Sequence, residues 1–277
     1  MFKRVMVAVV GIPALILVLG VAPDWAALAL TMVLCGVGAQ ELLHAVLGGG
    51  GKTLLRLTVL VAAVLPFFVF EEAGGLITER AGLPVVGALG LTFVVLMFLC
   101  AILEYRSEEH VLFRDVTAAI FAGLVFPLML SCLLRLRMGD FGQLLVFVPL
   151  GISFGSDTFA LFAGLLCGRH KLTPVSPKKT VEGCVGGLLG GVIGLALVKG
   201  VGLWALGLPF LTWGQVVLIG LAGSVVSQLG DLSFSIIKRE FGVKDYGKLL
   251  PGHGGVLDRF DSVTFVTPFV WLVLQFL

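Results

Sequence analysis

The sequence predicts an all-α fold: a polytopic transmembrane bundle of about nine helices. Of the 277 residues, 58% are hydrophobic and only 13% are charged. The mean hydropathy of +1.09 is far above that of soluble domains. The apolar residues also gather in runs that are long enough to cross about 30 Å of hydrocarbon as helices. Together these observations exclude a soluble globular protein.

The apolar runs follow one another through short connections, so we expect a single integral membrane domain over residues 1–277. Amino-terminal helices fill 1–142, and the helices and loops that carry the chemistry fill 143–277. The first run resembles a signal peptide, but no small-residue cleavage site follows it, which favours a retained first helix. The runs lie at 5–22, 25–47, 54–70, 84–103, 112–134, 143–167, 181–208, 213–237 and 262–277.

The distribution of positive charge predicts the orientation of the chain. With the amino terminus in the cytoplasm, fifteen of the nineteen Lys and Arg residues fall on the cytoplasmic side, as the positive-inside rule requires. The net charge of +2 gives no reason to expect a nucleic-acid partner. The five cysteines lie singly in apolar surroundings, which is typical of small hydrophobic side chains. We therefore expect a multi-pass protein of the cell membrane.

Six glycines in the run at 181–208 form overlapping small-xxx-small patterns, which allow helix backbones to approach closely. Because they lie inside a span, we favour helix packing over phosphate binding for them. They are Gly183, Gly186, Gly187, Gly190, Gly191 and Gly194.

Polar side chains follow one face of the helix expected at 213–237. A step of 100° per residue places Ser224, Ser227, Gln228, Asp231, Ser235 and Lys238 within roughly 60° of one line. The opposite face is left to Val225, Leu229, Phe234 and Ile236. An ionised carboxylate at the bilayer centre costs at least about 2.5–3.5 kcal/mol unless it faces protein, water or a cation. Asp231 therefore needs a partner.

Two predicted cytoplasmic loops, 168–183 and 238–261, combine basic residues with glycines and carboxylates. Solvated loops that merely orient the protein would explain the basic residues but not the glycines and carboxylates. Glycines flank His253, where a backbone approaches a ligand or adopts positive φ. If the last helix begins near Asp258 and Asp261, its first N–H groups would attract an anion.

Carboxylates beside oxygen-rich neighbours suit Mg²⁺, which commonly bridges a few carboxylates to substrate phosphates. Asp231 and Asp258 could converge on such an ion, with nearby Lys and Arg holding a polyphosphate. The alternative for Asp231 is an ion pair with Lys238 or Arg259. Asp157 is a second intramembrane acid, which either lines the same cavity or is hydrogen-bonded within the bundle.

Two further features of the loops leave alternatives open. Ser176 and Pro177 favour a helix start, with proline in the first turn, and this is compatible with a phosphate-binding role. His253 is a base, a phosphate donor or a turn residue.

The sequence over 235–261 reads S-x-I-K-R-x4-K-D-x-G-x2-L-P-x-H-G-G-V-x-D-R-F-D and resembles the signature of the phosphatidate cytidylyltransferase (CDP-diacylglycerol synthase) family. The resemblance extends to SDTFA at 156–160, SPKKTVEG at 176–183 and QLGDL at 228–232. The amino-terminal half is similar only in hydropathy. The chain departs from many relatives in having Phe234 in place of Glu, and Tyr246 in place of Ser.

The resemblance implies an enzyme that joins phosphatidic acid to CTP, giving CDP-diacylglycerol and pyrophosphate. It also implies a homodimer, Mg²⁺ held by Asp231 and Asp258, and a second cation, with K⁺ as the candidate. The catalytic residues expected are Asp231, Asp258, Lys238, Arg259 and His253. Those expected to bind CTP or the lipid are Ser156, Asp157, Ser176, Lys178, Lys179, Ser227, Gln228, Ser235, Arg239, Lys244, Asp245, Lys248, Gly254, Gly255 and Asp261.

Two other functions remain compatible with the sequence. One is a cytidylyltransferase for another lipid phosphate. The other is an ion-coupled transporter in which Asp157 and Asp231 line an ion path, although this reading leaves the HGGxxDRxD loop unexplained.

Overall fold

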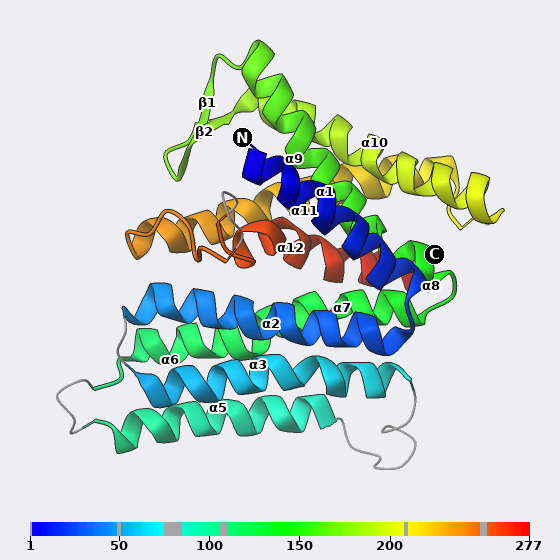
Figure 1. Cartoon of the computed structure of the whole chain (residues 1–277). Helices are drawn as coiled ribbons and strands as arrows, with labels where there is room; N and C mark the ends of the chain where they lie inside the picture. The colour runs from blue at the N-terminus through cyan, green and yellow to red at the C-terminus, as the bar shows by residue number, and fades with distance from the viewer. Residues whose placement is uncertain (1, 49–50, 75–84, 106–109, 208–209, 250–253) are drawn as a thin grey trace. The chain divides into compact units, whose positions relative to one another are not determined.

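The structure, a computed structural model, is almost entirely helical (Figure 1). It describes residues 2–48, 51–74, 85–105, 110–207, 210–249 and 254–277. The chain divides into two compact units, which are Met1–Met138 with Val243–Arg259, and Gly139–Gly242 with Phe260–Leu277. The predicted all-α architecture is confirmed. The signature loop at 243–259 groups with the amino-terminal helices rather than with the rest of 143–277.

The helices of the first unit are α1 (Phe2–Ile16, extended by a π-helical turn at Leu17–Val21), α2 (Asp24–Leu47), α3 (Lys52–Ala73), α5 (Val85–Leu103), α6 (Phe113–Ile120) and α7 (Phe126–Met138), the last two joined by a π-helical turn at Phe121–Val125. Helices α2, α3, α5, α6 and α7 lie side by side and pack through small residues (Figure 1). A Cβ on Gly38 would lie 2.7 Å from the ring of Phe126, and one on Gly123 would lie 2.6 Å from the ring of Phe93, so both glycines admit an aromatic ring.

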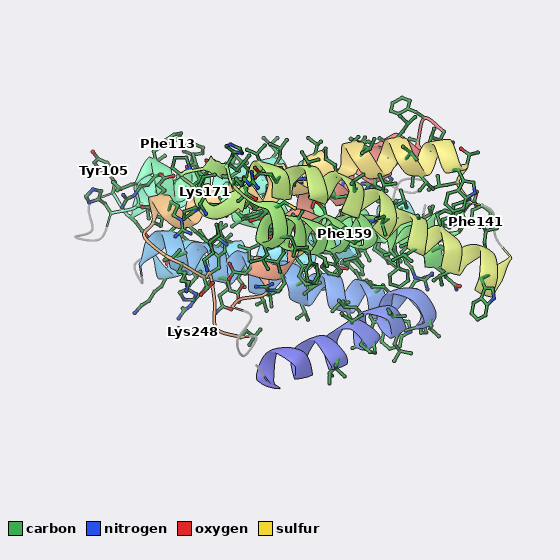
Figure 2. The ribbon with its side chains drawn as sticks, turned by 90° about the horizontal axis from the view of Figure 1, so that it is seen from above. Tyr105, Phe113, Phe141, Phe159, Lys171 and Lys248 are labelled. Atoms are coloured by element: carbon green, nitrogen blue, oxygen red, sulfur yellow. The ribbon has the colours of Figure 1, made fainter. Side chains whose placement is uncertain are left out.

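The two ends of the first unit differ in chemistry. At one end Arg135 of α7 forms an ion pair of 2.7 Å with Glu72 of α3. At the other end the aromatic side chains of Tyr105 and Phe113 are exposed (Figure 2). Exposed aromatic rings at a helix end are typical of the membrane interface.

The second unit consists of four long helices and one β-hairpin. In Figure 2, Lys171 of the hairpin and Phe141 lie at opposite ends of this unit. The elements are α8 (Gly142–Leu145), α9 (Val148–Cys167), β1 (Lys171–Thr173), β2 (Ser176–Thr180), α10 (Val181–Leu206), α11 (Trp213–Glu240) and, from Phe260 onward, α12 (Leu257–Leu274).

The glycine pattern of α10 packs against its neighbouring helices, as the sequence predicts. A Cβ on Gly190 or Gly194 would overlap a backbone carbonyl of α9, and one on Gly191 would lie 2.9 Å from the carbonyl oxygen of Gly220 in α11. The glycines of α10 thus let it touch both α9 and α11 along their backbones.

The predicted helix start at Ser176 and Pro177 is wrong. These residues begin β2, which pairs antiparallel with β1, and α10 begins only at Val181. The side chain of Thr180 accepts a hydrogen bond of 3.1 Å from the Gly183 N–H and caps the helix. The threonine cap and the strand pairing together outweigh the preference of proline for a first helical turn.

Each of the nine apolar runs contains a helix. Within the residues that the structure describes, seven helical segments between Asp24 and Glu240 are long and apolar enough to cross a membrane. The apolar part of the first helix, Val9–Val21, is shorter, and α12 begins with three charged residues within its first turns. The multi-pass character is confirmed, and the number of nine spans stays a prediction.

Candidate active site

A cavity of about 480 Å³ lies in the second unit between α9, the hairpin, the start of α10 and α11. Small residues such as Gly164 and Gly183 form much of its wall. The charged residues in its lining are three cations and two acids, namely Lys171, Lys178, Lys179, Asp157 and Asp231, and Gln228 adds an amide. This mixture of cations and carboxylates is suited to an anionic ligand that also carries a metal ion.

Asp231 lies in this cavity and forms an ion pair with Lys179 of β2. Its other carboxylate oxygen accepts a hydrogen bond of 3.3 Å from the Ser235 hydroxyl. The side chains of Asp231 and Lys179 are 24% and 26% exposed, so the pair is partly withdrawn from solvent. The acid in α11 therefore has the partner that the sequence requires, and this partner is a lysine of the hairpin.

The hairpin is held over the cavity by two further contacts. Arg239 of α11 donates a hydrogen bond of 3.1 Å from Nε to the carbonyl oxygen of Val175 in the hairpin turn. At the base of the hairpin, Glu182 lies 2.6 Å from Nδ1 of His170 and accepts a hydrogen bond of 3.1 Å from the Arg169 N–H. The sequence analysis assigned no role to Glu182. An acid in the first turn of a helix often accepts hydrogen bonds from nearby N–H groups, so its position could have predicted these contacts.

A third acid of the second unit, Asp261 of α12, is buried and accepts a hydrogen bond of 2.7 Å from the Ser262 N–H. The charges of Asp231, Lys238 and Asp157 act on its carboxylate. Carboxylates of α9, α11 and α12 thus lie close enough for their charges to interact. Yet no three His, Cys, Asp or Glu side chains of the described residues gather tightly enough to bind a metal by themselves.

Several residues predicted to bind substrate lie among hydrogen bonds that join the helices of the second unit. The hydroxyls of Ser156 in α9 and Ser224 in α11 lie 2.8 Å apart, and Ser224 donates a hydrogen bond of 2.8 Å to the carbonyl oxygen of Gly187 in α10. Gln228 donates one of 3.2 Å to the carbonyl oxygen of Cys184. Ser227 is fully buried, and within the described part of the chain its hydroxyl has no hydrogen-bond partner.

In the first unit, Asp258 organises the signature loop. Its Oδ2 accepts hydrogen bonds of 2.9 Å from the Tyr246 N–H and 3.0 Å from the Gly255 N–H. Gly254 adopts φ +86°, a conformation that L side chains rarely adopt, and a Cβ there would lie 2.9 Å from Asp258 Oδ2. The glycine next to His253 is thus required by the turn around Asp258.

Glu41 of α2, a residue that the sequence reasoning missed, is buried against the same loop. It accepts hydrogen bonds of 3.1 Å from the Val256 N–H and 2.9 Å from the Leu257 N–H. A Cβ on Gly247 or Gly255 would overlap its carboxylate. These N–H groups at the start of α12 were expected to attract a substrate anion, but a side chain of the protein itself occupies them.

The remaining predicted site residues divide into three groups. Ser176 is half-buried in β2. Lys244, Asp245, Lys248 and Arg259 are exposed in the first unit. His253 lies outside the described residues.

Phe234 was expected on the face opposite Asp231, and this is wrong. The phenyl ring is fully buried and meets Phe265 of α12 edge to face, with ring centroids 6.1 Å apart. Three residues after Asp231 is a rotation of about 300°, so Phe234 stands about 60° from Asp231 on the inner side of α11. It contributes packing between α11 and α12.

Comparison with known proteins identifies the family. The chain matches the model of the Cytidylyltransferase family over residues 2–277. It is 42% identical over 159 residues to the phosphatidate cytidylyltransferase of Bacillus subtilis, covering 57% of this chain and 56% of the relative. It is 48% identical over 120 residues to that of Staphylococcus haemolyticus, covering 43% and 44%.

The chain thus spans about half the length of these two relatives. It is also 31% identical over 255 residues to the phosphatidate cytidylyltransferase of Thermotoga maritima, covering 89% of this chain and 92% of the relative. With a family match along almost the whole chain, and with the SPKKT strand and the QLGDL helix meeting at one cavity, the chain belongs to the cytidylyltransferase family.

Proposed function

We propose that the protein transfers CMP from CTP to phosphatidic acid and so makes CDP-diacylglycerol and pyrophosphate. The observation that carries this proposal is the cavity in which Lys171, Lys178 and Lys179 face Asp157 and Asp231. Three cations in one cavity offset part of the negative charge of a triphosphate and a phosphomonoester. The names of the relatives agree with this substrate pair.

In the proposed reaction, a phosphate oxygen of phosphatidic acid attacks the α-phosphorus of CTP. The new P–O bond forms as the bond between the α-phosphorus and the bridging oxygen breaks, and pyrophosphate leaves with that oxygen. Both substrates are anions, so the first task of the protein is to reduce their mutual repulsion. The three lysines of the cavity do this, and they also hold the phosphates in line for attack.

Asp231 has two roles in this proposal. Without substrate, Asp231 forms an ion pair with Lys179. When substrate is bound, the Lys179 ammonium would turn to a phosphate, and the Asp231 carboxylate would then be available to bind a cation. The hairpin contact of Arg239 with Val175 keeps Lys178 and Lys179 over the cavity during this exchange.

The donors present fit Mg²⁺. This ion usually takes one or two carboxylates together with water and substrate phosphates, rather than a cage of protein ligands. The lack of a three-residue metal cluster among the described residues is compatible with that mode. The family resemblance assigns the ion to Asp231 and Asp258, and assigns a second cation, with K⁺ as the candidate, to the same acids. Mg²⁺ would supply charge neutralisation on the triphosphate as pyrophosphate leaves.

We further propose that the site faces the cytoplasm from the cell membrane, with the amino terminus on the same side. The support is the excess of basic residues in the loops assigned to that side. The family resemblance adds a homodimer, which cross-linking in native membranes would test.

The test is to incubate the purified protein with Mg²⁺, phosphatidic acid and CTP labelled in the α-phosphate. We expect label in the lipid phase and one pyrophosphate per labelled lipid. A polyprenyl phosphate and an ether-lipid phosphate serve as competing acceptors. Failure to use phosphatidic acid while one of these is labelled would reassign the substrate, and no CTP consumption with any acceptor would contradict the proposal.

A further inference from the structure

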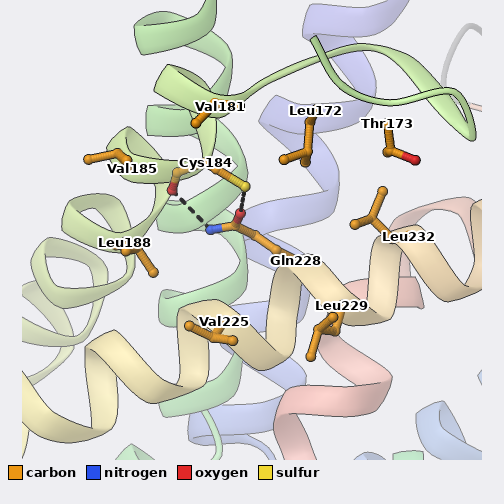
Figure 3. Close-up of a pocket in the computed structure, with 10 residues that line it drawn as sticks. All are labelled: Leu172, Thr173, Val181, Cys184, Val185, Leu188, Val225, Gln228, Leu229 and Leu232. Atoms are coloured by element: carbon orange, nitrogen blue, oxygen red, sulfur yellow. Dashed lines mark hydrogen bonds between the residues drawn. The ribbon is translucent and has the colours of Figure 1, made fainter. Parts of the chain in front are cut away.

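A second cavity of about 480 Å³ lies beside the first, and its lining is almost entirely apolar. Residues of α10 and α11 repeat at helical spacing along its two walls, and Leu172 and Thr173 of the hairpin cover one end (Figure 3). The wall residues are Val181, Cys184, Val185 and Leu188 of α10, with Val225, Gln228, Leu229 and Leu232 of α11. We call this cavity the apolar groove.

The groove exists because α10 and α11 touch at one point and separate from there. At Gly191 and Gly220 the two backbones are in contact, since a Cβ on Gly220 would lie 2.7 Å from the Val192 Cα. One turn nearer the hairpin, the neighbour of Gly187 in α11 is the side chain of Gln228 instead of backbone. Val185, Val225 and Leu229 are about half exposed, so the groove is open along its side.

The apolar groove joins the cation-lined cavity at two shared residues, Cys184 and Gln228. Gln228 is fixed at this junction because its amide bonds both the thiol and the carbonyl oxygen of Cys184 (Figure 3). The two cavities therefore adjoin at this pair, and the lining changes from three lysines on one side to an apolar wall on the other.

We propose that the apolar groove binds an acyl chain of the lipid substrate whose phosphate occupies the cation-lined cavity. This inference rests on the proposed function, because it names where that substrate is held. Such a lipid has an anionic headgroup and a hydrocarbon chain, and the two adjoining cavities offer a cationic lining for the first and an apolar lining for the second. The volume falls in the range of about 300–1,000 Å³ that is usual for small-molecule sites.

Filling the groove tests the assignment. Val225→Trp places a bulky ring in the groove, and Val217→Trp is a matched control, because Val217 lies on the same helix with 45% exposure against 48% and does not line the groove. We expect Val225→Trp to lower kcat/KM for dioleoyl phosphatidic acid at least about 10-fold with the KM for CTP unchanged. Val217→Trp should match the wild type.

Chain length provides the internal control. With dihexanoyl phosphatidic acid, whose chains are too short to extend far along the groove, the two variants should have equal kcat/KM. Equal behaviour of both variants on the dioleoyl lipid would overturn the groove assignment and leave the proposed function intact. No turnover of either lipid by the wild-type protein would overturn the proposed function and this inference with it.

A binding measurement on the wild-type protein avoids any folding defect of a variant. A phosphatidic acid with a photoreactive diazirine near the end of one acyl chain should label peptides of α10 and α11 that contain Leu188 and Leu229. Excess phosphatidic acid should suppress this labelling, and excess phosphatidylcholine should not. Equal suppression by both lipids would contradict a substrate site and indicate ordinary bilayer contact.

Discussion

Lys179 is the residue on which the charge balance of the cavity depends. It pairs with Asp231, and each side chain keeps about a quarter of its surface exposed, so water can solvate Asp231 when the lysine is removed. In the proposed reaction the same lysine moves to a substrate phosphate. Removing it should therefore affect turnover more than stability.

We expect Lys179→Ala to lower kcat/KM by about 100-fold, the usual cost of losing one charge-stabilising donor, with only a small change in thermal unfolding temperature. Turnover assays and thermal unfolding in detergent would measure both. Lys52→Ala, which removes an exposed lysine of α3 from the first unit, is the control and should resemble the wild type. Full activity of Lys179→Ala would remove the lysine from the mechanism.

Gly255 tests the contact of Glu41 with the signature loop. A Cβ at this position would lie 2.3 Å from the Glu41 carboxylate, so we expect Gly255→Ala to destabilise the protein by about 1–3 kcal/mol and to lower activity. In a double-mutant cycle, Glu41→Ala should remove most of the added cost, because the obstacle is gone. The control is Gly200→Ala, where a Cβ meets nothing within 4 Å. Additive effects of the two substitutions would show that Glu41 and Gly255 do not interact.

At the residue scale, the sequence predicts which groups need partners but not which partners they find. The position of Asp231 within an apolar helix requires a counter-charge, and that much is confirmed. Lys179 lies on a separate strand far earlier in the chain, so no spacing rule connects the two residues. Glu41 was missed for the same reason, since the backbone N–H groups that donate to its carboxylate lie more than two hundred residues away in sequence.

Among the elements, α10 shows how glycine determines helix packing. Its backbone meets that of α9 so closely that a Cβ on Gly194 would overlap the carbonyl oxygen of Gly151. In a membrane, where burial of apolar surface does not drive helix association, close backbone contact is a main source of stability. The helices of the second unit can therefore pack this closely only because these positions carry no Cβ.

Gly194→Ala should separate α9 from α10 and lower the thermal unfolding temperature in detergent, by the equivalent of about 1–3 kcal/mol. Gly200→Ala lies on the same helix in open space and should be neutral or slightly stabilising. An unfolding temperature of Gly194→Ala equal to that of the wild type would contradict the backbone contact.

The helices could be predicted from apolar runs, because the requirement that every backbone group be hydrogen-bonded in hydrocarbon leaves few alternatives. The hairpin could not, since its strands Lys171–Thr173 and Ser176–Thr180 are short and polar and contain Pro177. Its stability depends on Arg239 and on the pair of Lys179 with Asp231, which are contacts with α11 that local sequence does not encode.

For the whole molecule, the resemblance of 235–261 to a family signature predicts the function without any knowledge of the fold. The structure adds that the signature divides between two units, with Asp231 in the second and Asp258 in the first. It also shows that an amino-terminal helix supports the signature loop, because Glu41 of α2 holds the loop that Asp258 closes.

The most direct test of the account is Mg²⁺-dependent pyrophosphate release by Asp231→Asn and Asp258→Asn in parallel with the wild-type protein. Each substitution keeps the shape of the side chain and removes its charge, so we expect turnover to fall by at least about 10²–10³-fold at every Mg²⁺ concentration. Thermal unfolding should show that both variants remain folded in detergent. Near-normal turnover with an unchanged Mg²⁺ dependence in either variant would contradict the central claim that these carboxylates act on the nucleotide through a divalent ion.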